Sequence, residues 1–287
     1  MRLPMARCLA WLLCCAATAA QAQPQAVHFP SLDGPPATSL SAYLFPAPGE
    51  GRHPAMVFLH GCGGLYNHAG RIESREREWA RRLNDAGITV LMVDSLGSRD
   101  HGEMCAPAHF VAAIYRARAY DAYAALRYLQ ALPEVRADRV GVMGWSQGGG
   151  TLLNTIRATS PARPASLPDG DFRAAVAFYP ASCNTKRQGG SWASPVPLLA
   201  LIGARDVWTP LAPCQALMNS LAEGTEVSLQ AYPNAYHDFD WPDMPVHEVP
   251  AFRTRDGVVP IEGTDPEARA DAQQRVMAFL TARLLAP

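Results

Sequence analysis

Residues 139–150 read RVGVMGWSQGGG, and this stretch decides the fold. Its first five residues are mostly apolar, which is typical of a buried strand, and a helical pattern, Gln147–Arg157, begins directly after Ser146. Gly144 and Gly148 flank the serine at the spacing Gly-x-Ser-x-Gly. Glycine at both positions keeps side chains from colliding where a strand turns sharply into a helix, and the turn exposes the serine hydroxyl. The stretch therefore predicts a nucleophile at the end of a strand.

Short apolar strands alternate with amphipathic stretches along the rest of the chain. Six core strands are expected, and most of them are almost continuously apolar, as strands buried on both faces are: Ala55–Leu59, Ile88–Val93, Arg139–Met143, Ala174–Phe178, Leu198–Ile202 and Val227–Ala231. Helical patterns lie between and after them: Arg71–Asp85, Pro107–Leu132, Gln147–Arg157, Pro210–Leu221 and Asp265–Leu285. This order predicts an α/β fold, a doubly wound, mostly parallel sheet with helices on both faces. The stretch from Gln23 to Pro54, with Leu40–Phe45 as its clearest strand, is expected to add an antiparallel edge.

Two segments do not fit this alternation. Ser160–Asp171 is rich in proline and is expected to form a surface loop. Trp241–Gly263 is longer than an ordinary connection between elements, so we expect it to be either functional or mobile. No change of composition divides the remaining chain, and we interpret residues 23–287 as one domain.

Residues 1–22 have the pattern of a secretory signal peptide. Arg2 and Arg7 give a positive start, Cys8–Ala20 is a short apolar run, and Ala20-Gln21-Ala22 supplies a small-x-small cleavage motif. The apolar run is shorter than the roughly 20 residues that a membrane-spanning helix needs. We therefore expect a periplasmic or secreted protein without a membrane span, cleaved near Ala22.

The charge balance excludes one class of partner. The 287 residues include 25 Lys and Arg against 26 Asp and Glu, a formal net charge of -1. Without residues 1–22, which hold two arginines and no acid, the counts become 23 and 26, and the net charge becomes -3. A nucleic-acid-binding protein would show a clustered basic excess, so the composition excludes that function. A hydrophobic content of 48% is sufficient for a buried core.

Four cysteines remain after the expected cleavage: Cys62, Cys105, Cys183 and Cys214. An even number in an oxidising compartment favours two disulfides, for which three pairings are possible. We expect Cys62–Cys105 and Cys183–Cys214, because Cys62 and Cys105 lie in loops after neighbouring strands. Cys183 and Cys214 likewise follow adjacent strands, all on the same edge of the sheet. Four buried free thiols are the alternative.

A serine hydroxyl becomes a good nucleophile only when a base removes its proton. In this strand–turn–helix context the acid and the base follow the serine in chain order. Asp206 follows the fifth expected core strand and His237 follows the sixth, so both lie beyond the carboxyl ends of parallel strands. We expect Ser146 as nucleophile, His237 as general base and acid, and Asp206 as the residue that orients the imidazole. Asp94, which follows an earlier strand, and His247, in the long loop, are the alternatives.

An oxyanion hole requires two backbone N–H groups directed at the developing negative oxygen. We expect one from Gln147, the residue after the nucleophile. The other is expected from the glycine-rich loop His60–Gly64, with Cys62 as first choice and Gly63 as the alternative, because glycines let the backbone approach a substrate closely.

Several side chains near these loops are candidates for substrate contacts. Arg99 is a candidate for holding a substrate carboxylate, with a salt bridge to Asp94 or Asp100 as the alternative. Aromatic residues are candidates for lining an apolar pocket, although each is also a candidate for the core: Tyr66, Trp145, Trp208, Tyr236 and Phe239. No spacing of His, Cys or acidic residues is typical of a metal site, so we expect no metal and no cofactor.

Taken together, these motifs resemble the dienelactone hydrolase family of the α/β-hydrolase fold. The likeness extends from about Pro54 to the C-terminus and rests on His60–Gly64, Asp94–Arg99 with Cys105, Gly144–Gly148, Phe178–Pro180, Asp206 and Tyr236–Phe239. The resemblance implies hydrolysis of a small-molecule ester or lactone, with Ser146, Asp206 and His237 in the catalytic positions. Ser146 stands where the enzymes that named the family carry cysteine. A peptidase or acyltransferase with the same triad, or an exported binding protein without activity, are the alternatives.

Overall fold

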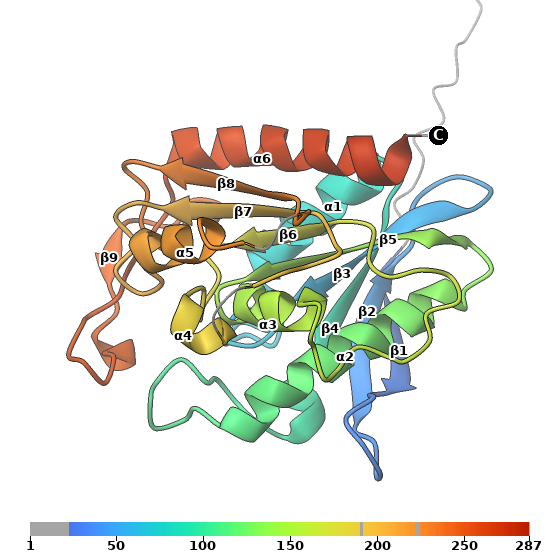
Figure 1. Cartoon of the computed structure of the whole chain (residues 1–287), viewed down its shortest axis with the longest axis horizontal. Helices are drawn as coiled ribbons and strands as arrows, with labels where there is room; N and C mark the ends of the chain where they lie inside the picture. The colour runs from blue at the N-terminus through green and yellow to red at the C-terminus, as the bar shows by residue number, and fades with distance from the viewer. Residues whose placement is uncertain (1–22, 190–191, 222–223, 287) are drawn as a thin grey trace, which may run out of the picture.

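The computed structural model describes residues 23–189, 192–221 and 224–286, so the expected signal peptide lies outside the described residues. An eight-stranded sheet forms the centre, in the order β1-β2-β4-β3-β5-β6-β7-β8 (Figure 1). Its strands are β1 (Gln25–Pro30), β2 (Ser39–Phe45), β3 (His53–Leu59), β4 (Thr89–Asp94), β5 (Val135–Trp145), β6 (Ala175–Phe178), β7 (Leu198–Gly203) and β8 (Val227–Tyr232). In this sheet β2 is antiparallel to β1 and β4, and the other neighbouring pairs are parallel. The mostly parallel sheet expected from the sequence is confirmed.

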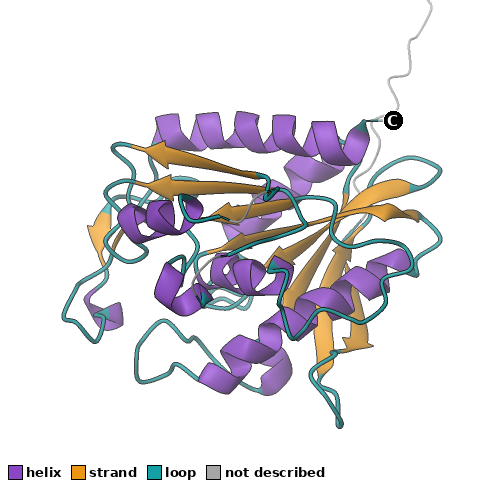
Figure 2. Ribbon diagram, in the orientation of Figure 1, coloured by secondary structure: helices purple, strands orange, loops and turns teal. Residues whose placement is uncertain are grey.

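Helices cover both faces of the sheet (Figure 2). The longer ones are α1 (Ser74–Asp85), α2 (Ala112–Gln130), α3 (Gln147–Ile156), α5 (Leu211–Met218) and α6 (Pro266–Leu280), and α4 (Thr185–Gln188) is a single turn. Two hydrophobic cores result, one containing buried residues of α2, α3 and α5 and the other containing those of α1 and α6. Side chains alternate along β3, so Val57 lies in the first core while Met56 and Phe58 lie in the second.

The stretch from Gln23 to Pro54 forms the antiparallel edge as expected, but with two strands, of which the sequence clearly indicated only the second. The strand expected at Leu40–Phe45 is antiparallel, but β1 pairs with its outer side, so β2 is second from the edge. Only Phe29 of β1 is buried, so the apolar pattern that reveals a core strand is missing there. Likewise α2 begins at Ala112 rather than at Pro107, and Phe110 and Val111 are exposed in the loop before it.

Candidate active site

The serine lies at a sharp turn between β5 and α3. Ser146 has a φ of +50°, a conformation that non-glycine residues rarely adopt and that marks local strain. The flanking glycines are required for space. A Cβ at Gly148 would lie 2.0 Å from the carbonyl oxygen of Leu59, and one at Gly144 would lie 2.5 Å from the carbonyl oxygen of Gly148. The close packing of the turn against β3 therefore fixes the position of the serine.

Asp206 and His237 are brought together by the loops after β7 and β8. The distance from His237 Nδ1 to Asp206 Oδ2 is 2.7 Å, and both side chains are buried. The Asp206 carboxylate also accepts hydrogen bonds from the backbone N–H groups of Trp208 and Thr209 and from the Thr209 hydroxyl, at 2.7–2.8 Å. These bonds fix the carboxylate, and the carboxylate in turn orients the imidazole.

The environment of His237 favours its protonated form. Burial opposes the charge, but the attraction of Asp206 and its hydrogen bond outweigh burial and raise the pKa of His237. The ring lies between two aromatic side chains, with centroid distances of 4.5 Å to Tyr179 and 4.9 Å to Trp208. Within the described chain, neither Ser146 Oγ nor His237 Nε2 has a hydrogen-bond partner, and such contacts commonly tighten only when substrate binds.

The two sequence alternatives lie apart from this pair. Asp94 accepts a hydrogen bond of 2.9 Å from the N–H of Gly97, and His247 is exposed in a short hairpin. Neither side chain contacts Asp206 or Ser146 in the described structure.

The loop after β3 meets the first turn of α3 beside the serine. Gln147 is the first residue of α3, so its backbone N–H has no acceptor within the helix. Cys62 lines the same cavity as Ser146 and Gln147, whereas Gly63 does not. The Cys62 carbonyl accepts a hydrogen bond of 2.8 Å from the N–H of Met104, which holds the loop in place. The structure thus brings Cys62, but not Gly63, to the lining of the cavity at Ser146.

Both disulfides form with the expected pairing. Cys62 and Cys105 have Cα atoms 4.9 Å apart, and Cys183 and Cys214 have Cα atoms 4.6 Å apart. The first bridge joins the loop after β3 to the loop after β4, and the second joins the loop after β6 to α5. Three of the four cysteines line the cavity at Ser146, so the bridges connect the segments that surround the serine.

A cavity of about 900 Å³ opens beside the serine. Its aromatic lining residues are Phe110, Tyr115, Tyr120, Trp208 and Phe252. Its charged lining residues are four arginines, Arg116, Arg157, Arg187 and Arg255, and the described lining contains no Asp or Glu. None of these arginines has a carboxylate within 4.0 Å among the described residues, so the cavity presents uncompensated positive charge.

Of the six candidate substrate-contacting side chains, the structure brings only Trp208 to the cavity. Arg99 is held by Asp121 at 2.7 Å and Asp33 at 2.9 Å, so its partners are neither a substrate nor the expected Asp94 or Asp100. Trp145 is buried in the core, and Tyr66 packs edge-on against Tyr43. Tyr236 and Phe239 also lie outside the cavity lining.

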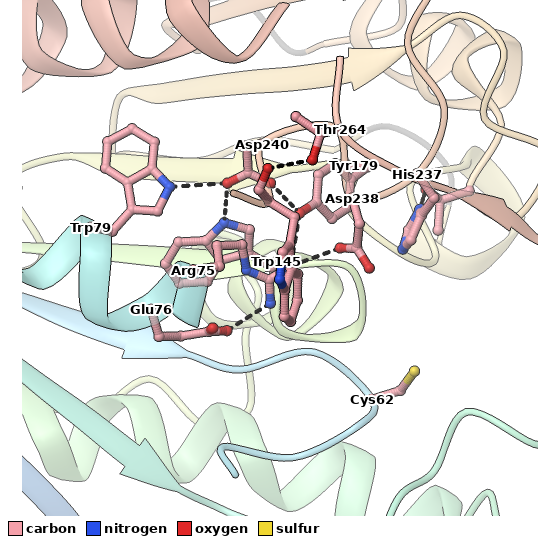
Figure 3. Close-up of polar contacts among 12 residues, drawn as sticks. Cys62, Arg75, Glu76, Trp79, Trp145, Tyr179, His237, Asp238, Asp240 and Thr264 are labelled. Carbon is pink, nitrogen blue, oxygen red and sulfur yellow. Dashed lines mark hydrogen bonds and ion pairs between the residues drawn. The ribbon is translucent and has the colours of Figure 1, made fainter. Parts of the chain in front are cut away.

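A buried polar cluster, which no sequence pattern indicated, supports the loop that carries His237 (Figure 3). Arg75 of α1 donates to Asp238 at 2.7 Å and to the hydroxyl of Tyr179 at 3.0 Å. Asp240 accepts hydrogen bonds from the side chains of Trp79, Trp145 and the same Tyr179. The cluster thus fixes the residues on the C-terminal side of His237 against α1, β5 and β6.

The long loop expected at Trp241–Gly263 contacts the histidine directly. It contains the short strands β9 (His247–Glu248) and β10 (Ile261–Glu262), which pair with each other. The N–H of His237 donates to the carbonyl of Ile261 at 3.3 Å, and the N–H of Gly263 donates to the carbonyl of His237 at 3.0 Å. Burial and the charge of Asp238 raise the pKa of Glu262 to about 7. The loop therefore holds the backbone of His237 and places an acid near it.

Within the described part of the chain, no cluster of three His, Cys, Asp or Glu side chains is suited to hold a metal ion. No described helix is long and apolar enough to cross a membrane.

Comparison with known proteins supports the resemblance seen in the motifs. The sequence model of the Dienelactone hydrolase family matches residues 40–284. The "Putative hydrolase YtaP" of Bacillus subtilis (strain 168) is 28% identical over 119 residues, which is 37% of this chain and 40% of that protein. The match thus spans less than half the length of this relative.

Solved structures share the fold at low sequence identity. A dienelactone hydrolase from Anabaena variabilis ATCC 29413 has a TM-score of 0.59 at 20% identity, covering 92% of this chain and 100% of its own. Thermogutta terrifontis esterase 2, solved phosphorylated by paraoxon, has a TM-score of 0.60 at 17% identity, covering 90% of this chain and 94% of its own. Because the family match covers most of the sequence, this chain belongs to the dienelactone hydrolase family.

Proposed function

We propose that this chain is an exported serine hydrolase that cleaves carboxylic esters or lactones, with residues 23–287 as its catalytic domain. The observation that carries the proposal is the combination of Ser146 on a strained turn with the buried pair of Asp206 and His237. Membership of the dienelactone hydrolase family, whose name denotes lactone hydrolysis, supports esters and lactones as the substrates.

In the proposed mechanism, His237 removes the proton of the Ser146 hydroxyl as the serine oxygen attacks the ester carbonyl. Asp206 keeps the imidazole in the required tautomer and stabilises the imidazolium that forms. The negative oxygen of the tetrahedral intermediate accepts hydrogen bonds from the N–H groups of Gln147 and Cys62. His237 then donates its proton to the leaving alcohol, and water attacks the acyl-enzyme by the same route.

Covalent labelling tests the proposal. Paraoxon is a suitable probe because the esterase from Thermogutta terrifontis, which shares the fold, was solved phosphorylated by it. We expect stoichiometric phosphorylation of Ser146, identified by peptide mass spectrometry, and a burst of para-nitrophenol from para-nitrophenyl acetate. Ser160→Ala is the matched control for Ser146→Ala, because both serines line the cavity and each is 8% exposed. Full activity in Ser146→Ala, or labelling at another residue, would contradict the proposal.

Export is the other part of the proposal, and the two disulfides support it because such bonds persist in oxidising compartments. Expression of the full chain in a bacterium with a periplasm tests it. We expect mature protein outside the cytoplasm with Gln23 as its first residue, and uncleaved protein in the cytoplasm would argue against export.

A further inference from the structure

A buried arginine links the two parts of the proposed oxyanion hole. Arg118 of α2 is 0% exposed. It donates from Nη1 to the side-chain oxygen of Gln147 at 2.8 Å and from Nη2 to the carbonyl oxygen of His60 at 2.5 Å. Gln147 supplies one expected N–H donor, and His60 begins the loop that supplies the other. One guanidinium therefore contacts both segments.

This guanidinium has no counter-ion in contact with it. Among the described residues no carboxylate lies within 4.0 Å of Arg118. Asp121, one turn further along α2, is engaged by Arg99 at 2.7 Å and by the Ser31 hydroxyl at 2.6 Å. Burial lowers the pKa of Arg118 to about 10, although the charges of Asp121 and Asp94 partly offset burial, so Arg118 remains charged at neutral pH. Burying a cation without an anion in direct contact is costly, so the guanidinium would stabilise a further negative charge nearby.

The adjoining histidine does not provide a second charge. Burial, followed by the charge of Arg118, lowers the pKa of His60 well below its usual value, so its imidazole is neutral at physiological pH. His60 Nδ1 lies 2.7 Å from the carbonyl of Gly61, a contact within the same loop. The positive charge beside the two donor segments therefore belongs to Arg118.

We propose that Arg118 is a positioning residue of the oxyanion hole, which aligns Gln147 with the His60–Gly64 loop and whose charge stabilises the oxyanion formed at Ser146. The inference rests on the proposed function. Its hydrogen bond to the His60 carbonyl holds the start of the loop that carries Cys62, and its bond to Gln147 holds the first residue of α3. The oxyanion formed during the reaction adds a negative charge beside these segments, so the effect of Arg118 should arise in the transition state.

Arg118→Met and Arg118→Lys test this role, with Arg127→Met as the matched control. Arg127 is an exposed arginine of the same helix that does not line the cavity. We expect kcat on a para-nitrophenyl ester to fall about 100-fold in Arg118→Met with little change in KM, comparable to loss of one oxyanion donor. Arg118→Lys keeps the charge and should recover part of kcat, while Arg127→Met should match the wild type.

A trifluoromethyl ketone that forms a tetrahedral adduct on the serine supplies a second readout. Its affinity should fall across the Arg118 variants in proportion to kcat/KM, because it reproduces the negative oxygen. If replacing Arg118 affects folding alone, the fraction of active protein will fall. In that case kcat per titrated active site and the affinity for the trifluoromethyl ketone will stay unchanged. That result would overturn the inference.

If Arg118→Met does not fold, Gln147→Glu tests the same idea. This variant keeps the backbone N–H and an oxygen for Arg118 but places a carboxylate against the guanidinium. We expect kcat to fall about 10-fold or more at unchanged or higher thermal stability, and an unchanged kcat would overturn the inference. A wild-type protein that neither hydrolyses esters nor reacts with paraoxon would instead contradict the proposed function itself.

Discussion

The indole N–H of Trp145 donates a hydrogen bond of 2.9 Å to Asp240, which ties the residue before Ser146 to the loop that carries His237. The two residues are 95 positions apart in the sequence. Asp240 is fully buried and accepts two further side-chain hydrogen bonds. The nucleophile and the base therefore share one buried anchor.

Trp145→Phe should weaken this anchor while keeping a ring in the core. Loss of a hydrogen bond to a buried carboxylate should cost about 2 kcal/mol of unfolding free energy, measured by urea denaturation. We also expect a lower kcat, because the loop that holds His237 is fixed less firmly. Trp192→Phe is the control, since Trp192 is equally buried but donates to the backbone of Leu153, away from the serine. Equal losses of kcat in both variants would contradict a specific role for the anchor.

The positive cavity predicts a preference for acidic esters. We expect the mono-para-nitrophenyl ester of glutaric acid to be hydrolysed with a higher kcat/KM than the pentanoate ester of equal chain length. Replacing Arg157 or Arg187 by Gln should reduce the preference about 10-fold, the effect of one charge-assisted hydrogen bond, and salt should weaken it as well. Arg127→Gln is the control because Arg127 lies outside the cavity lining. Equal kcat/KM values for the two esters would contradict this prediction without contradicting the proposed esterase function.

The pH dependence of kcat/KM should show the environment of His237. Burial opposes protonation, but the charge and hydrogen bond of Asp206 raise the pKa of His237 overall. The base must be neutral to accept the serine proton, so activity should fall on acidification at a higher pH than for an unperturbed histidine. Asp206→Asn should lower kcat/KM strongly. It should also shift the acid limb of the pH profile, where activity falls as His237 becomes protonated, to lower pH.

Glu262 should contribute to the same profile. Its negative charge raises the pKa of His237, and its own pKa of about 7 means that it is ionised above neutral pH. We expect Glu262→Gln to move the acid limb to lower pH while changing the plateau rate little. Glu248→Gln, an exposed position in the same hairpin, is the control and should leave the limb in place. An unmoved limb in Glu262→Gln would show that the acid does not influence the base.

Removal of the Cys62–Cys105 bridge should affect both stability and chemistry. It closes a segment of 43 residues, for which the chain-entropy model predicts a loss of about 4 kcal/mol. The Cys183–Cys214 bridge closes 31 residues and should cost a similar amount. We expect a larger fall in kcat after loss of the first bridge, since Cys62 is an expected oxyanion donor. A larger fall after replacing Cys183 and Cys214 by Ala would contradict that placement of the donor.

The positions of residues that follow buried strands were predictable from the sequence. A continuous apolar run identifies the strand, and the residues directly after it form the loop at its carboxyl end. Asp206 and His237 illustrate this, and their side chains meet as expected. Arg75 and Glu76 illustrate the opposite case, since the charged pattern of α1 is typical of a solvated helix face. Both are buried because Arg75 pairs with Glu76 at 2.6 Å and with Asp238, 163 positions away, at 2.7 Å. Such long-range partners leave no periodic signal in a single sequence.

The loop from Trp241 to Gly263 serves two structural purposes at once. Ile261 and Gly263 hold the backbone of His237, while Phe252 and Arg255 of the same loop form part of the cavity wall. Replacing the loop with that of a relative would therefore exchange selectivity and reactivity together. Phe110, Tyr115 and Tyr120 line the cavity without such bonds to the base, and these positions are the better place to redesign substrate range.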